Sequence, residues 1–284
     1  MLSLGRSVTR RVGTYSVALM GTPAFLADCS LKRLDAFVGN EADDRVVVAG
    51  TSTTQFAARG SDAPMKIEIF SDIACPWCFI GKRRLERALR DSSTTAELSF
   101  RAFQLQPGLP PGGVPAEAFF ERKFGGRERV RAIFERVTEV GRAVGIQFDF
   151  LNQARAPNTE LAHRVICFAS SKGQAAPTVE ALFSGYFEHG LNVCELSEIV
   201  HALERAQIEV DSAELLSALD AGFGQEQVAR DLSLAREYGI GGVPLFIFDQ
   251  RYSVEGAQPV EHFARLIQKL RAEDSPQLRS QSAS

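Results

Sequence analysis

The segment Met65-Lys-Ile-Glu-Ile-Phe-Ser-Asp-Ile-Ala-Cys-Pro-Trp-Cys78 contains the strongest structural signals in the chain. Its first part, Lys66 to Phe70, alternates polar and apolar residues and contains β-branched side chains, which predicts a strand. After Cys78, apolar residues recur at helical spacing: Ile80, Leu85, Ala88 and Leu89. Glu97 to Leu105 predicts a second strand. A strand, a helix and a strand within about forty residues indicate one βαβ unit with parallel strands.

A long helical region follows a Pro/Gly-rich loop at Gln106 to Pro115. We expect its helices at Ala116–Phe124, Arg127–Val144, after Asn158 as N-cap, Pro177–His189, Leu196–Ala206, Ser212–Leu219 and Gln225–Tyr238. Leu245–Phe248 and Tyr252–Glu255 then predict a hairpin, and Pro259 opens a last helix. The expected fold class is α/β, arranged as βαβ…ββα, with a large all-helical insertion at about residues 106–238 between the second and third strands.

The two ends of the chain lack such patterns. Residues 1–64 show no sustained hydrophobic period, so we expect a disordered extension or a targeting segment; Val46 to Val48 resembles a strand fragment without convincing flanks. The charge-free stretch Val12 to Ala27 follows three arginines, which leaves an organelle transit peptide, a secretory signal or a misplaced start as alternatives. We expect a cytoplasmic protein, with a mitochondrion or another organelle as the alternative, and a disordered tail at residues 273–284.

Composition narrows the function classes. The 284 residues are 45% hydrophobic, which supports a packed core, and the net charge of −3 offers no basic field for nucleic acid. No apolar run reaches 18 residues, so no membrane-spanning helix is expected. Five cysteines are too few and too scattered for a disulfide scaffold. We interpret Cys167 and Cys194, in apolar helical stretches, as buried small hydrophobes and assign Cys29 no role.

Cys75-Pro76-Trp77-Cys78 is the candidate reactive pair. The pair follows a strand and opens a helix, so Cys75 would lie at the helix N-terminus, where free N–H groups favour a thiolate, the nucleophilic form of the sulfur. Pro76 suits the first helical position and leaves Cys75 exposed, whereas Cys78, one turn further, is more buried and can resolve a mixed disulfide. A zinc site is disfavoured because no second ligand pair exists, and two incidental core cysteines would not favour Pro-Trp between them. We therefore expect no metal.

Val243-Pro244 is the second candidate element. It follows two glycines, Gly241 and Gly242, and an X-Pro bond can be cis. A cis Pro244 facing Cys75 would present the Val243 main chain to an extended peptide or to glutathione.

These residues together resemble the DsbA-like thioredoxin family, most closely its FrnE-like branch. The resemblance rests on Met65 to Arg83, Pro157 to Arg164, Gly242 to Phe246 and Val254 to Pro259, and it spans about Met65 to Leu270. It implies a thioredoxin-like domain at residues 65–272, with Cys75 as attacking thiol, Cys78 as resolving thiol and Pro244 as cis-proline. It implies no bound cofactor, with glutathione as a possible co-substrate.

Two departures from the family qualify the resemblance. Some FrnE-like proteins have an extra cysteine pair near the C-terminus, whereas this chain has no cysteine after Cys194. The related 2-hydroxychromene-2-carboxylate isomerases and kappa-class glutathione transferases typically have serine where this chain has Cys75, so cysteine favours redox chemistry.

Further residues are candidates for the substrate surface. Pro76, Trp77, Val243, Pro244 and Asn158 form the expected substrate-binding set. His163 and Arg164 belong to the same matched segment as Asn158 and could shape the cleft, or simply pack and cap a helix. Asp72, just before the redox pair, could assist proton movement or cap a turn.

The expected function is a thiol–disulfide oxidoreductase or isomerase that acts on protein or small-molecule disulfides and thiols. A glutathione-dependent isomerase or transferase is the alternative enzyme, and a chaperone-like binding module is the non-enzymatic alternative. Neither nucleic acid nor a membrane is an expected partner.

Overall fold

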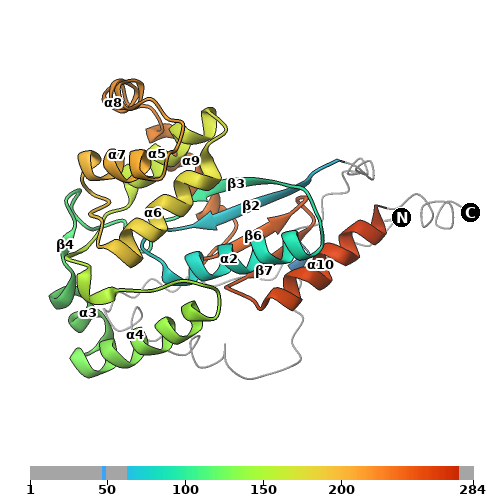
Figure 1. Ribbon diagram of the computed structural model, residues 1–284, viewed down its shortest axis with the longest axis horizontal. Helices are drawn as coiled ribbons and strands as arrows, with labels where there is room; N and C mark the ends of the chain where they lie inside the picture. Colours follow the sequence, from blue (N-terminus) through green and yellow to red (C-terminus); the bar gives the residue numbers. More distant parts are fainter. Residues whose placement is uncertain (1–46, 49–62, 275–284) are drawn as a thin grey trace, which may run out of the picture. The chain divides into compact units, whose positions relative to one another are not determined.

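A mixed five-stranded sheet forms the centre of the computed structural model, which describes residues 47–48 and 63–274 (Figure 1). Its strands lie in the order β1-β7-β6-β2-β3. They span Val47–Val48 (β1), Met65–Ser71 (β2), Ala96–Ala102 (β3), Leu245–Phe248 (β6) and Tyr252–Glu255 (β7). β2 runs parallel to β3, with Ile69 opposite Phe100, and antiparallel to β6. The predicted parallel pair and the predicted hairpin are therefore both present.

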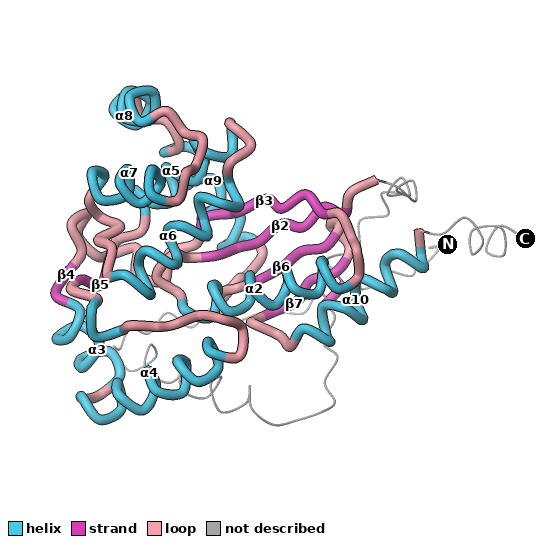
Figure 2. The backbone as a smooth tube through the Cα atoms, viewed as in Figure 1, coloured by secondary structure: helices cyan, strands magenta, loops and turns pink. Residues whose placement is uncertain are grey.

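Helices α2 (Pro76–Asp91) and α10 (Val260–Glu273) lie side by side on one face of the sheet (Figure 2). Ile67 and Ile69 of β2 point into the core that these helices share. Phe70 points to the opposite face, where it packs with Ala235 of α9 (Gln225–Glu237). β2 is therefore covered on both faces, which explains its nearly continuous burial and fixes the position of the loop that follows it.

The helical insertion joins β3 to β6 as expected. Its remaining elements are β4 (Val114–Pro115), α3 (Ala116–Phe124), α4 (Arg127–Arg142), the 3₁₀ turn η1 (Phe150–Asn152), β5 (Arg155–Ala156), α5 (Glu160–Ser171), α6 (Ala175–His189), α7 (Leu196–Arg205) and α8 (Ser212–Asp220). The β4–β5 ribbon was not predicted, because two-residue strands leave no periodic pattern. The Phe79 ring of α2 stacks on the Phe183 ring of α6, with 5.1 Å between the ring centres, so the insertion packs directly against α2.

The α/β thioredoxin-like fold is confirmed, but two local expectations were wrong. Val47–Val48 forms strand β1 against Ser253 and Tyr252, although we expected residues 1–64 to be a disordered extension or a targeting segment with only a strand-like fragment at Val46 to Val48. The pairing depends on β7, which is distant in sequence. α10 continues to Glu273, and Asp274 is buried against Arg251, so the tail begins later than predicted. The expectations for residues 1–46, 49–62 and 275–284 lie outside the described residues.

The scattered cysteines also differ from expectation. Cys167 lies on α5 as predicted, but it is half-buried. Cys194 lies in the turn between α6 and α7, not in a helix, and its thiol donates to the Asn158 carbonyl oxygen at 3.5 Å. Both thiols are therefore only partly covered by packing.

Candidate active site

The segment from Asp72 to Cys78, called the redox loop after its predicted role, is held by its own main-chain hydrogen bonds. Cys75 occupies the N-cap of α2, and Pro76 begins the helix. The Cys75 N–H donates to the Asp72 carbonyl oxygen at 2.9 Å, and the Cys78 N–H donates to the Cys75 carbonyl oxygen at 3.0 Å. Cys75 thus lies at the positive end of the helix dipole, as the sequence predicted, with Cys78 one turn along.

Cys75 is more buried than expected, whereas Cys78 is buried as the sequence predicted. Cys75 is 4% exposed and Cys78 is 2% exposed, so the prediction of an exposed Cys75 was wrong for this conformation. The reason is packing from far along the chain: both thiols belong to the core that contains Phe79 and α6, while half-buried Trp77 and Val243 pack against that core. The local sequence of a helix start does not reveal this cover.

Cys78 is held in its thiol form. Burial raises its pKa well above the ordinary value, and a hydrogen bond with Cys75 and the charge of Cys75 raise it further. Hydrogen bonds from the Asp72 main chain and the Ser71 side chain act in the opposite direction, with smaller effect. Of the pair, Cys78 is therefore the thiol that burial keeps protonated.

Cys75 meets the start of β6. The Val243–Pro244 peptide bond is cis, as the sequence predicted. The Cys75 thiol lies 3.6 Å from the Val243 carbonyl oxygen, to which it can donate a hydrogen bond. The geometry brings together the two sequence elements that were singled out, a redox pair and a cis X-Pro turn.

Asp72 and His163 form a buried polar pair beside the loop. Asp72 is 1% exposed, and its carboxylate accepts from the N–H groups of Ala74 at 3.2 Å and Leu105 at 2.6 Å. The His163 Nε2 lies 3.7 Å from the Asp72 Oδ1 and 2.9 Å from the Phe103 carbonyl oxygen. Asp72 therefore shapes the turn before Cys75 and links it to the end of β3.

Asn158 lies next to the helix start without being its N-cap. Thr159 occupies the N-cap of α5, and the Asn158 Oδ1 accepts from the Glu160 N–H at 3.0 Å. The same oxygen accepts from Gln104 at 3.0 Å, and the Asn158 amide donates to the Leu109 carbonyl oxygen at 2.8 Å. These bonds tie together the loops after β3.

Arg164 belongs to another region of the insertion. Its guanidinium donates to the carbonyl oxygens of Phe223, at 3.0 Å, and of Leu219. Arg164 therefore joins α5 to the end of α8, whereas His163, its neighbour in sequence, lies beside Asp72. Successive helical residues point to different faces, which separates the two roles.

The sequence did not predict that Lys123 of α3 would affect the site. Its ammonium lies 5.6 Å from the ring centres of both Phe119 and Phe124. Burial lowers the pKa of Lys123, while the charges of Cys75 and Asp72 act to raise it. A lysine 48 positions after Cys75 has no local pattern that would associate it with the redox loop.

Among residues 47–48 and 63–274, no three His, Cys, Asp or Glu side chains gather as a metal ion would require. No helix of this described part is long and apolar enough to cross a membrane.

The fold and the site together define a thioredoxin-fold protein with a helical insertion. The chain belongs to the DSBA-like thioredoxin domain family, because the model of that family matches residues 66–268. In sequence, it is 24% identical over 206 residues to the uncharacterized protein YwbO of Bacillus subtilis (strain 168), covering 71% of this chain and 94% of that one.

Solved structures give the same assignment. The probable DsbA oxidoreductase SCO1869 from Streptomyces coelicolor is 30% identical, with a TM-score of 0.66 over 75% of this chain and 92% of that one. A 2-hydroxychromene-2-carboxylate isomerase shares the fold at 15% identity, with a TM-score of 0.57 over 74% and 98% of the two chains. These neighbours agree with the DsbA-like thioredoxin family that the sequence resembles.

Proposed function

We propose that the protein is a thiol–disulfide oxidoreductase that uses Cys75 as the attacking thiol and Cys78 as the resolving thiol. The observation that supports this most directly is that the two cysteines have different positions and different environments. Cys75 lies at a helix N-terminus beside the Val243 carbonyl oxygen, while Cys78 is buried behind it with a raised pKa. One sulfur is placed to attack, and the other keeps its proton until it is needed.

The exchange proceeds in two balanced steps. The Cys75 thiolate attacks one sulfur of a substrate disulfide, forming a mixed disulfide and releasing the other sulfur as a thiolate. Cys78 then loses its proton and attacks the Cys75 sulfur, closing the Cys75–Cys78 disulfide and releasing the second substrate thiolate. The protein dithiol is oxidised by two electrons, and the substrate disulfide is reduced by two. The reverse sequence oxidises a substrate dithiol.

The Val243–Pro244 turn supplies the binding surface in this proposal. The Val243 main chain beside Cys75 is suited to an extended peptide or to glutathione, with Pro76 and Trp77 in the first turn of α2 next to it. Because Cys75 is 4% exposed, the substrate has to displace part of the cover over the sulfur. The proposed compartment is the cytoplasm.

Reduction of insulin driven by dithiothreitol tests the proposal. We expect turbidity from precipitated insulin B chain with the wild-type protein and none above background with Cys75→Ser. Cys194→Ser is the matched control, because it removes a half-buried thiol that does not belong to the Cys75–Cys78 pair, and it should keep wild-type activity. Full activity of Cys75→Ser would refute the proposal.

A glutathione-dependent isomerase is the second candidate, supported by the shared fold with the 2-hydroxychromene-2-carboxylate isomerase. In those relatives serine typically stands at the position of Cys75. Cys75→Ser therefore has a second readout, glutathione-dependent isomerisation of 2-hydroxychromene-2-carboxylate. Isomerase activity in the wild type, without insulin reduction, would favour this candidate over the oxidoreductase.

A further inference from the structure

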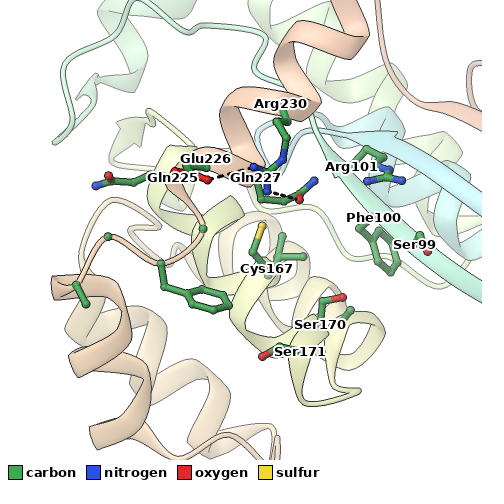
Figure 3. A pocket seen from close by; sticks show the side chains of 16 residues that line it. Ser99, Phe100, Arg101, Cys167, Ser170, Ser171, Gln225, Glu226, Gln227 and Arg230 are labelled. Atoms are coloured by element: carbon green, nitrogen blue, oxygen red, sulfur yellow. Dashed lines mark hydrogen bonds and ion pairs between the residues drawn. The ribbon is translucent and has the colours of Figure 1, made fainter.

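Two cavities meet at Cys167 on the side of α5 that faces β3. The outer one is an open pocket of about 720 Å³, into which Cys167, Ser170 and Ser171 project from α5 (Figure 3). Gln227 and Arg230 of α9 line its opposite wall. This pocket lies outside the redox loop, because neither Cys75 nor Cys78 contributes to its lining.

The inner cavity extends from Cys167 to the end of β2. It has a volume of about 10 Å³ and shares four lining residues with the outer pocket: Phe100, Arg101, Ile166 and Cys167. Ser71, His163 and Val179 line its other walls. A volume of about 10–15 Å³ suffices for one water molecule where several polar groups surround it. Ser71, Arg101 and His163 provide such groups.

Ser71 connects this cavity to the redox pair. Its side chain hydrogen-bonds with the Cys78 thiol, and it also lines the inner cavity. Cys78 is 2% exposed, so its proton has no direct contact with solvent. On the other side of the pair, Cys75 lies against the Val243 carbonyl oxygen, where substrate is expected.

We propose that one water in the inner cavity, together with the Ser71 hydroxyl, forms the route by which the Cys78 thiol passes its proton to solvent in the outer pocket. The inference rests on the proposed function. The step is balanced: the proton leaves along Ser71 and the water, and the Cys78 thiolate bonds to the Cys75 sulfur. The bond between Cys75 and the substrate sulfur breaks with its electron pair on the departing thiolate.

Neighbouring charged groups are already engaged elsewhere. Asp72 meets Cys78 through its main chain, while its carboxylate accepts from Ala74 and Leu105. The Arg101 guanidinium pairs with Glu68 and Asp231, and His163 Nε2 bonds with the Phe103 carbonyl oxygen. In this proposal the Ser71 hydroxyl, which meets the Cys78 thiol, passes the proton to the cavity water, while these charged groups stay with the partners they have.

The test isolates the step that Cys78 performs. 5,5′-Dithiobis(2-nitrobenzoate) reacts with Cys75 and releases one thionitrobenzoate, and attack by Cys78 then releases a second with first-order kinetics. The reference protein has Cys29→Ser, Cys167→Ala and Cys194→Ser, so that stray thiols add no signal. Two variants are compared with it. Ser71→Ala removes the hydroxyl, and Cys167→Leu, which replaces Cys167→Ala of the reference protein, fills the cavity.

We expect both variants to slow the second release at neutral pH by about tenfold. The first release should stay within about twofold, because it does not involve Cys78. Should the leucine variant misfold by circular dichroism, Val179→Leu fills the same cavity from the opposite wall. An unchanged second release in the cavity-filled variant overturns the water route. Absence of any second release from the reference protein instead refutes the dithiol exchange itself.

Discussion

The Cys75 Sγ lies 3.6 Å from the Val243 carbonyl oxygen, although 168 residues separate the two positions in the sequence. The contact exists because α2 and the start of β6 approach each other closely. The approach is close at Gly81 of α2: a Cβ added there would lie 3.0 Å from Phe246 Cζ and 3.1 Å from Pro244 Cγ. The separation between the redox loop and the proline turn is therefore set by a residue without a side chain.

A branched side chain at Gly81 should push these two elements apart. Gly81→Ala gains about 1 kcal/mol of helix propensity, which offsets the mild crowding, so we expect a change within about 1 kcal/mol. Gly81→Val forces two more carbons against Phe246 and Pro244 and should cost about 1–3 kcal/mol. Urea unfolding measures both, and insulin reduction should fall in the valine variant. Gly108→Val is the control, because no atom lies within 4 Å of its added Cβ.

Lys82 connects α2 to α6 through a buried ion pair. Its ammonium lies 2.6 Å from Glu180 and 2.7 Å from Glu86, and its side chain is 4% exposed. Glu180→Gln leaves the buried ammonium with one carboxylate, so we expect a loss of about 1–3 kcal/mol in the free energy of unfolding. The exposed pair Arg131–Glu135 supplies the control, since Glu135→Gln should cost less than about 0.5 kcal/mol. Equal losses in the two variants would contradict the argument.

Lys123 should influence the reactivity of Cys75. Its half-buried ammonium experiences the charge of Cys75, and a nearby cation stabilises a thiolate. Lys123→Met is therefore expected to slow alkylation of Cys75 by iodoacetamide at neutral pH about threefold or more. Arg122→Met is the matched control, because Arg122 is the next residue on α3 and lies over the same Phe119 ring at 6.0 Å. Equal rates for the two variants would show that Lys123 has no specific effect.

Local patterns predicted the parts of this protein that depend on local physics. The alternation at Lys66 to Phe70 and the helical spacing after Cys78 predicted β2 and α2, because burial of one face requires such a period. The cis peptide at Pro244 followed from the Gly-Gly sequence before it and the family resemblance. The placement of Cys75 at a helix N-terminus needed only the position of Pro76.

Features that depend on contacts between distant segments could not be predicted in this way. The burial of Cys75 depends on α6 and its neighbours, and β1 exists only because β7 offers an edge. The proximity of Lys123 to the redox loop is likewise a product of how α3 folds back. His163 and Arg164 illustrate this most clearly, because they are adjacent in the sequence but have different neighbours. His163 pairs with buried Asp72, whereas Arg164 binds the carbonyl oxygens that follow α8.

Alkaline pH should destabilise the reduced protein through its buried thiols. Burial raises the pKa of Cys167 to about 11 and raises those of Cys78 and Cys194 as well. An unfolded thiol loses its proton near pH 8.5, so between about pH 8.5 and 11 the native state binds more protons than the unfolded state. Stability is then greatest below this window and falls as the pH rises through it.

Urea unfolding at pH 8 and pH 10.5 measures this loss, with reductant present for the reduced proteins and absent for the oxidised one. Burial of Lys123 acts with the opposite sign, because its lowered pKa makes the native state release a proton first, so the thiol effect has to be isolated by comparison. Cys167→Ala removes one titrating thiol and should reduce the loss between the two pH values, whereas oxidation of the Cys75–Cys78 pair should remove the contribution of Cys78. A loss of the same size in all three proteins would mean that the alkaline transition has another origin, such as Tyr186, whose pKa is also raised by burial.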